Sequence, residues 1–273
     1  MSATAAQRVL APFGRRRLEV TANEPLGAYR VLSAADPEGP VPAAGQFFML
    51  STDEGWGGGE GGRPFLPRAF SMLRREGDEV RFMLEDIGPG TSRLATLAPG
   101  DGLRVVGPLG AGFTPPPTHG ALLVGGGVGL PPLCCLQDAL LASHVETTTL
   151  VGFRSADHAA AATLLRDPRV ATDDGSAGHR GPVTELLERE LDETGAPQRT
   201  VYACGPPAML EAVRRLCAAR AVPAQLALES GMACGFGACF GCVVALRAGG
   251  YARVCVDGPV LDAHLLAEVP AHP

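Results

Sequence analysis

The sequence predicts an antiparallel β-barrel, followed by a parallel sheet covered by helices and a short cysteine-rich C-terminal segment. Three observations support this prediction. Residues 1–115 alternate short β-type runs with Gly and Pro turns, strand and helix patterns alternate beyond the prolines at 115–117, and four of the eight cysteines lie between positions 234 and 255. With 273 residues, about two full domains are expected. We place the boundaries at 1–115, 116–223 and 224–273.

The first domain contains β-type runs and no good helical pattern. The clearest strands are Arg17–Ala22, Ala28–Ala34, Gln46–Ser51, Glu79–Leu84 and Gly102–Val106. Short strands at this spacing are typical of a barrel or a sandwich. The Gly-rich stretch 55–62 reads as a flexible loop inserted between two strands.

The second domain alternates its patterns. Predicted strands are Ala121–Val124, Thr147–Phe153, Thr200–Ala203 and Ala224–Leu228, and predicted helices are Pro132–Ser143, Ala156–Leu165, Gly181–Leu191 and Pro207–Ala219. This alternation predicts a parallel sheet with helices on its faces.

Composition excludes several classes of function. The net charge of −6 argues against a nucleic-acid partner. All basic side chains are Arg, so lysine-based chemistry within the chain is excluded. No apolar run approaches the roughly 20 residues of a membrane span, and the N-terminus has no apolar signal region. A cytoplasmic location and no membrane association are therefore expected.

The C-terminal cysteines have the spacing of an iron–sulfur site. Cys234, Cys239 and Cys242 form C-x4-C-x2-C, and Cys255 follows after twelve residues. This is the plant-type ferredoxin spacing for a [2Fe–2S] cluster, in which thiolates bind the iron. Glycines at 235, 237 and 241 would permit unusual backbone angles and close approach of N–H groups to the sulfurs. The alternative is a structural zinc site, although zinc ribbons usually pair two C-x2-C units and only one is present.

Two loops at strand ends indicate a dinucleotide site. Gly125, Gly126, Gly127 and Gly129 follow a strand and precede a helix, where glycines let a pyrophosphate approach the backbone. The pattern is not a strict GxGxxG, and a plain strand–helix turn is the alternative. A second loop, Cys204-Gly205-Pro206, also joins a strand to a helix. Cys204 lies beside a nicotinamide ring or is simply a small buried residue, and the remaining cysteines (Cys134, Cys135 and Cys217) are expected in the core.

Two segments of the first domain suit a phosphate. Arg68 opens a strand and is followed by Ala69, Phe70 and Ser71, which combines a forked donor with a nearby hydroxyl. Further on, a turn could present successive backbone N–H groups to the same anion. That turn consists of Gly88, Pro89, Gly90, Thr91 and Ser92.

In this order, the motifs resemble the ferredoxin–NADP reductase superfamily, in which an FAD-binding barrel precedes a nicotinamide-binding α/β domain. The resemblance implies that Arg68 contacts FAD phosphate, that Phe70 lies near the flavin and that 88–92 is the pyrophosphate loop. It also implies that 125–132 and 204–206 are the nicotinamide motifs. Ala69 stands where the family often has Pro, and the loop at 55–62 looks long for the family.

The stretches Met232–Cys242 and Cys255–Val260 are similar to one branch, the electron-transfer subunits of B-type dihydroorotate dehydrogenases. This implies a partner subunit that oxidises dihydroorotate on FMN in pyrimidine biosynthesis, forming a hetero-oligomer. Electrons would then pass through the [2Fe–2S] cluster and FAD to NAD+, with no general base in this chain. The cluster segment should lie near a subunit interface, where Met232, Phe236 and Phe240 either contact the partner or pack internally.

Alternatives remain. Small subunits of NADH-dependent ferredoxin:NADP+ oxidoreductases and of sulfide dehydrogenases look similar, and a non-catalytic zinc-stabilised binding module is a rival of another class. The presence of all four cysteines favours the dihydroorotate branch, because some proteins of the ferredoxin-linked group have Asp in place of one cluster cysteine. The choice between NAD and NADP is open from the residues alone: Arg154 and Ser155 could accept a 2′-phosphate, whereas Asp157 could bind a free ribose hydroxyl. The resemblance favours NAD.

Overall fold

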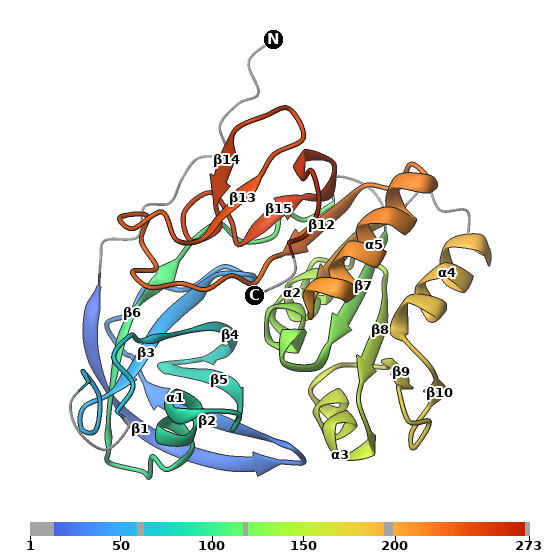
Figure 1. Ribbon diagram of the computed structural model, residues 1–273. Coiled ribbons are helices and arrows are strands. Elements are labelled where there is room, and N and C mark those ends of the chain that lie inside the picture. The colour runs from blue at the N-terminus through green and yellow to red at the C-terminus, as the bar shows by residue number, and fades with distance from the viewer. Residues whose placement is uncertain (1–13, 59–62, 117–119, 194–198, 271–273) are drawn as a thin grey trace.

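The structure is a computed structural model that describes residues 14–58, 63–116, 120–193 and 199–270. Three parts surround a common centre (Figure 1): a barrel, a sheet with helices, and the C-terminal segment lying across the top of both. None of the helices in these ranges is both long and apolar enough to span a membrane.

The N-terminal part is a closed six-stranded barrel in which every neighbouring pair is antiparallel. Its strands are β1 (Arg15–Leu26), β2 (Tyr29–Ala35), β3 (Phe47–Thr52), β4 (Arg68–Glu76), β5 (Glu79–Glu85) and β6 (Gly102–Leu109), in the order β1-β2-β5-β4-β3-β6. Side chains such as Leu32, Phe48 and Phe82 fill the interior. The predicted barrel is therefore confirmed.

One helix in this part contradicts the sequence interpretation. Residues Pro89–Ala95 form α1, so most of the segment read as a turn at 88–92 is helical. Seven residues are too few to show a helical period against a background of strands. The Thr91 hydroxyl, which accepts the N–H of Gly88 at 3.0 Å, closes the N-terminal end of this helix.

The second part is a seven-stranded sheet. Its strands are β7 (Gly120–Gly126), β8 (Thr147–Phe153), β9 (Arg169–Thr172), β10 (His179–Arg180), β11 (Arg199–Cys204), β12 (Ala224–Ala227) and β15 (Val260–Asp262), in the order β10-β9-β8-β7-β11-β12-β15. All neighbours are parallel except β15, which runs antiparallel to β12. The predicted parallel sheet is confirmed, although β9, β10 and β15 were too short to be found in the sequence.

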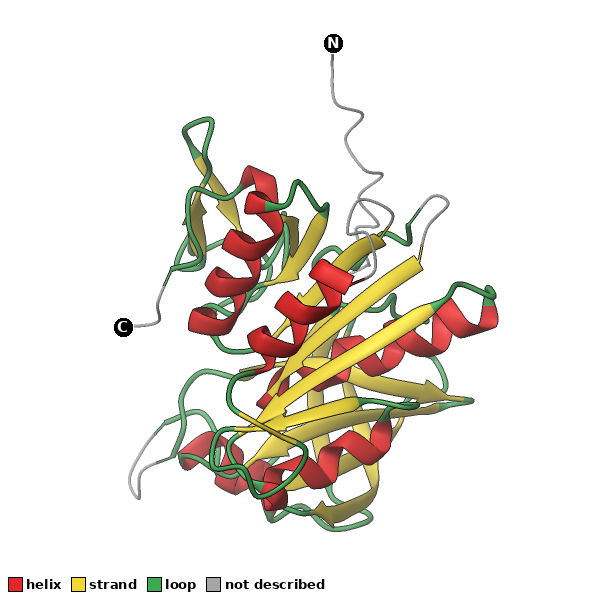
Figure 2. Cartoon of the chain, turned by 90° about the vertical axis from the view of Figure 1, so that its right-hand side faces the viewer, coloured by secondary structure: helices red, strands yellow, loops and turns green. Residues whose placement is uncertain are grey.

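Helices cover both faces of this sheet (Figure 2). They are α2 (Leu130–Ala142), α3 (Ala156–Ala159), α4 (Val183–Glu193) and α5 (Pro207–Ala219). Because side chains alternate along β7, Ala121 and Leu123 contact α2, whereas Leu122 and Val124 face α4 and α5. Helix α2 also packs against β4, which places it between the sheet and the barrel.

The helix predicted for 156–165 is shorter than expected. It consists of the single turn α3 followed by a 3₁₀ helix, η2 (Ala160–Leu164). In the part of the chain that the structure describes, the other 3₁₀ helices are η1 (Gly127–Gly129) and η4 (Ala263–Leu265).

The C-terminal segment is tied to both other parts. It contains a small hairpin of β13 (Val243–Ala245) and β14 (Tyr251–Arg253), and it contributes β15 to the large sheet. Strand β12, which begins at the predicted boundary of 223/224, also belongs to that sheet. The domain ranges therefore stay a prediction, because one apolar cluster joins barrel residues such as Met49, sheet residues such as Val201, and Cys242 and Cys255.

Candidate functional site

A cavity of about 760 Å³ lies where the three parts meet, and we call it the central cavity. Barrel strand β4 contributes Arg68 through Ser71, β5 contributes Met83 and Glu85, and α1 contributes Thr91. The segment 228–232, immediately before the cysteines, also lines the cavity. The volume lies within the range of about 300–1,000 Å³ that is typical of ligand sites.

The two predicted phosphate segments meet at this cavity. A Cβ atom on Gly90 would lie only 2.6 Å from the Arg68 Nε atom, so the guanidinium packs directly on the backbone of α1. Arg68 also donates to the carbonyl of Leu66 at 2.6 Å and lies over the ring of Trp56, 5.8 Å from its centre. These contacts hold the guanidinium at the edge of the cavity.

The remaining residues of the 88–92 segment differ in their roles. Thr91 lines the cavity, but its hydroxyl is engaged by its own loop. Ser92 donates its N–H to the Gly88 carbonyl at 2.8 Å and its hydroxyl to Asp86 at 2.5 Å. Both donors of Ser92 are therefore used by residues just before the helix. Gly88 is extended and has open space where a Cβ would lie.

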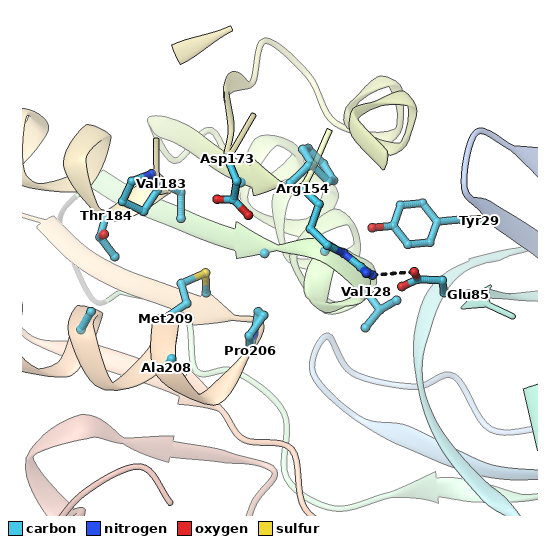
Figure 3. A pocket seen from close by; sticks show the side chains of 16 residues that line it. Tyr29, Glu85, Val128, Arg154, Asp173, Val183, Thr184, Pro206, Ala208 and Met209 are labelled. Atoms are coloured by element: carbon cyan, nitrogen blue, oxygen red, sulfur yellow. Dashed lines mark hydrogen bonds and ion pairs between the residues drawn. The ribbon is translucent and has the colours of Figure 1, made fainter. Parts of the chain in front are cut away.

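A second cavity, of about 570 Å³, lies at the carboxyl ends of β7, β8 and β9 (Figure 3). Gly126, Gly127 and Val128 line it from the loop after β7, and Pro206 and Met209 line it from the start of α5. Ligands bind at this edge of open parallel sheets, because loops from successive strands converge there. Glu85 and Val128 line both cavities, so the two are neighbours.

The two predicted dinucleotide loops touch each other. A Cβ on Gly129 would lie 2.6 Å from the carbonyl carbon and oxygen of Cys204, and a Cβ on Gly205 would lie 3.0 Å from the Gly126 backbone. A Cβ on Gly126 would in turn lie 2.9 Å from Pro206. Glycine is thus required by close contact between the loops. Gly125 packs under α2, with Leu133 within 3.0 Å of its Cβ position.

Cys204 itself is buried in the apolar cluster beneath α2 and lines neither cavity. Burial, with a smaller contribution from the Glu229 carboxylate, raises the pKa of Cys204 well above its ordinary value. The thiol therefore stays protonated. Cys134 and Cys217 are also buried, and Cys135 is partly buried against the barrel core, as expected.

The residues proposed for choosing between NAD and NADP are arranged differently from the expectation. Arg154 lines the second cavity, but its guanidinium donates to Glu85 at 2.6 Å. The Ser155 hydroxyl is bonded to His158, and Asp157 lies outside the cavity. Besides Glu85, the wall contains the carboxylate of Asp173, just beyond β9, which the sequence interpretation missed because β9 was not recognised.

The four C-terminal cysteines come together in two pairs. Cys234 and Cys239 are hydrogen-bonded to each other, and Cys242 and Cys255 form the second pair, in which the Cys255 N–H donates to the Cys242 sulfur at 3.4 Å. Burial opposes ionisation of Cys234, but hydrogen bonds from the N–H groups of the following loop outweigh it and lower the pKa of Cys234 to about 6. Over the ranges that the structure describes, no three or more His, Cys, Asp or Glu side chains gather as ligands of one metal ion.

Glycines shape the loop between these cysteines. Gly235 and Gly237 have φ of 77° and 88°, as predicted for unusual backbone angles. A Cβ on Gly235 would lie 2.5 Å from the Met49 side chain, so the loop packs tightly on barrel strand β3. Gly241 does not have a positive φ; Phe240 does instead, at 58°.

Several site residues were not found in the sequence. Glu229, Ser230 and Gly231 line the central cavity, and Tyr29 lines the second cavity from the barrel side. They carry no local motif, and only the packing of the three parts brings them to the cavities.

Comparison with known proteins agrees with this architecture. Residues 229–267 match the iron-sulfur cluster binding domain of dihydroorotate dehydrogenase B. Among solved structures, the chain is similar to NADH-dependent reduced ferredoxin-NADP oxidoreductase, with a TM-score of 0.76, 24% identity, and coverage of 98% of this chain and 92% of the other. It is also similar to phthalate dioxygenase reductase, with a TM-score of 0.63, 16% identity, and coverage of 94% and 96%. These likenesses confirm the fold.

Curated relatives are closer in sequence. The dihydroorotate dehydrogenase B (NAD(+)) electron transfer subunit of Geobacillus thermodenitrificans is 34% identical over 264 residues, covering 92% of this chain and 98% of the relative. The subunit of the same name from Caldanaerobacter subterraneus subsp. tengcongensis is 35% identical over 234 residues, covering 82% and 86%. By this identity over most of both lengths, the chain belongs to the family of dihydroorotate dehydrogenase B (NAD(+)) electron transfer subunits.

Proposed function

We propose that this chain carries electrons between an FMN-containing dihydroorotate dehydrogenase subunit and NAD+, through a [2Fe–2S] cluster and FAD, in pyrimidine biosynthesis. The observation that carries the proposal is the order of the sites. The central cavity borders the second cavity at Glu85 and Val128, and it reaches Met232 and Val243 of the cysteine-bearing segment. This is the order that transfer from a cluster through a flavin to a nicotinamide requires.

The central cavity suits FAD. When bound there, FAD would accept single electrons from the cluster and would pass two of them to NAD+ as a hydride. Arg68 offers a charge-assisted donor to a phosphate, and Ala69, Phe70 and Ser71 form the wall along β4. Gly90 allows the guanidinium to sit against α1, where a side chain would displace it.

The second cavity suits the dinucleotide. Gly126, Gly127 and Pro206 line it, and the close contacts of Gly125, Gly129, Cys204 and Gly205 hold the two loops together. Asp173 in the wall favours NAD over NADP, because a carboxylate accepts hydrogen bonds from ribose hydroxyls and repels a 2′-phosphate. The protonated Cys204 thiol is a packing group and takes up no proton in this scheme.

The cysteine pairs suit a binuclear cluster. Each iron of a [2Fe–2S] centre takes two protein thiolates, and the pairs 234/239 and 242/255 offer that division. A zinc ion would need all four thiolates around one point.

The surface beside the cysteines suits a protein partner. Of the ten large apolar side chains that the described residues expose, five lie in the C-terminal segment: Phe236, Phe240, Val243, Tyr251 and Leu265. Phe240 is 62% exposed and is held by the Arg253 guanidinium, 5.2 Å from the centre of its ring. Met232, in contrast, lines the central cavity and packs against the main core. We therefore assign Phe236 and Phe240 to the partner interface and Met232 to internal packing.

The test is co-expression with an FMN-containing dihydroorotate dehydrogenase subunit, followed by assay of NAD+ reduction by dihydroorotate. The complex should catalyse this reaction, whereas the chain alone should oxidise NADH with artificial acceptors and leave dihydroorotate unchanged. Phe240→Ser should weaken the complex without changing the NADH oxidation of the isolated chain. Robust dihydroorotate oxidation by the chain alone would contradict the proposal, and a stable complex only with a multi-cluster flavoprotein would favour the ferredoxin-linked alternative.

A further inference from the structure

One ion pair crosses the second cavity and joins the barrel to the sheet. Arg154, at the end of β8, donates from Nη2 to the Glu85 Oε1 atom at 2.6 Å, and Glu85 ends barrel strand β5 (Figure 3). Both side chains line the second cavity, and Glu85 lines the central cavity too. Arg154 is also the single cationic side chain among the described residues that line the second cavity.

The charges of this cavity do not match those of a dinucleotide. A diphosphate carries two negative charges, whereas the wall offers Glu85 and Asp173 as anions and Arg154 as a cation. Glycine backbone supplies N–H groups but no full charge. A diphosphate that enters therefore meets one guanidinium, and that guanidinium is already bonded to a carboxylate.

The position of the guanidinium indicates which phosphate it would reach. In Figure 3 the Arg154 side chain extends toward Glu85 and Val128 and away from Asp173. Val128 follows the glycines that are proposed above for the diphosphate, whereas Asp173 is the carboxylate proposed above for the ribose. Arg154 is therefore placed for the diphosphate and not for a 2′-phosphate.

We propose that Arg154 is the diphosphate ligand and that Glu85 is its competitor, so that binding exchanges the Glu85 bond for a bond to the diphosphate. This inference rests on the proposed function of the second cavity. Arg154 is 66% exposed, so its guanidinium has room to move. Glu85, only 15% exposed, keeps a neighbour after the exchange, since His158 Nε2 lies 3.4 Å from the same oxygen. Glu85 thus weakens dinucleotide binding and favours release of the reduced product.

The experiment measures dissociation constants of the FAD- and cluster-loaded chain for three probes: NADH, ADP-ribose and 2′-AMP. Glu85→Gln keeps the shape and removes the charge. It should tighten binding of NADH and ADP-ribose by about two- to fivefold, the range for one exposed ion pair. Binding of 2′-AMP, which lacks the diphosphate, should not change. Arg154→Ala should weaken NADH binding, and Glu85→Gln should give no gain in the Arg154→Ala background.

The matched control is a second ion pair between barrel and sheet domain. Arg74 of β4 pairs with Asp138 of α2 at 2.6 Å, and neither lines a cavity. Asp138→Asn should leave NADH affinity unchanged. An equal gain in Asp138→Asn would mean that any loosening of the domains tightens binding, and would overturn the inference.

The other outcomes are equally distinct. Unchanged or weaker NADH binding by Glu85→Gln, or a gain that persists in the Arg154→Ala background, would overturn the competition. A gain for 2′-AMP would assign Arg154 to the 2′-phosphate and overturn the diphosphate assignment. Failure of the unmodified chain to bind NADH would overturn the proposed function, and this inference with it. Flavin absorbance before each titration shows that every variant retains FAD.

Discussion

A methyl group at position 129 should separate the two loops that border the second cavity. The Cβ of Gly129→Ala would lie 2.6 Å from the carbonyl carbon and oxygen of Cys204 and 2.6 Å from the Gly205 Cα atom. All three are backbone atoms, so no side chain can rotate away. The φ of −78° and ψ of 1° at position 129 are open to alanine. The expected damage therefore comes from contact alone.

The magnitude follows from the distances. Ordinary contact begins at 3.4 Å, so the loops must move apart by about 0.8 Å, the difference between 3.4 and 2.6 Å. Overpacking of this kind costs about 1–3 kcal/mol. Replacing glycine also lowers the conformational entropy of the unfolded chain, which offsets about 0.4–1 kcal/mol of this destabilisation. We expect a net loss of about 1–2 kcal/mol in the free energy of unfolding. A displacement approaching 1 Å at a reacting centre can lower the rate by about 100-fold.

The assay compares Gly129→Ala with Gly120→Ala, using urea unfolding and NADH oxidation with an artificial acceptor. Gly120 begins β7 in the same sheet, and a Cβ there has its nearest neighbours at 3.4–3.7 Å. The control should match the unmodified protein, whereas Gly129→Ala should be less stable. It should also lose at least tenfold in kcat/KM for NADH, because the displaced loops misplace the bound dinucleotide. Equal stability and equal kcat/KM in the two variants would refute the steric reasoning.

Three further predictions concern single side chains. Arg68→Ala removes a charge-assisted phosphate contact of about 1.5–3 kcal/mol, so FAD should wash out on gel filtration; unchanged flavin content would exclude Arg68 as the ligand. Asp173→Asn should lower the preference for NADH over NADPH in steady-state kinetics, and an unchanged ratio would exclude Asp173 from that choice. Hydrogen bonds, chiefly from Arg214, lower the pKa of Glu211 to about 2, and Glu211 also accepts the N–H of Val269. A carboxylate with a depressed pKa stabilises the fold at pH values above its ordinary pKa of 4.5. Glu211→Gln should therefore lower the free energy of unfolding by about 1 kcal/mol at neutral pH. The difference in thermal midpoint should shrink as the pH falls below about 4.5, and a constant difference would contradict the linkage.

Local motifs were the part of the site that the sequence could predict. The glycines of 125–129, the Cys204 loop and the four C-terminal cysteines occupy short runs whose spacing reflects backbone contact or ligand geometry. The convergence of Arg68 with the 88–92 segment was also predicted, and the structure brings Arg68 within contact of Gly90. Helix α1 was missed because seven residues leave no periodic signal.

The remaining site residues depend on tertiary packing. Glu85 is an ordinary charged residue at the end of a strand, and only the approach of the barrel to β8 makes it the partner of Arg154. Asp173 follows a strand of four residues, too short for its pattern to stand out. The segment 229–231 carries no motif of its own, and its place in the cavity wall follows from the pairing of β12 with β15. Such residues have no signature in sequence because their neighbours are distant along the chain.

The most direct test of the proposed function is anaerobic titration of the isolated chain with NADH, followed by electron paramagnetic resonance. We expect loss of flavin absorbance and a signal from a reduced [2Fe–2S] centre, with about two iron atoms per chain. Cys239→Ser, which changes an exposed cysteine of the first pair, should lose the resonance signal while its flavin is still reduced by NADH. Zinc in place of iron, or a flavin that stays oxidised after NADH is added, would contradict the proposed function.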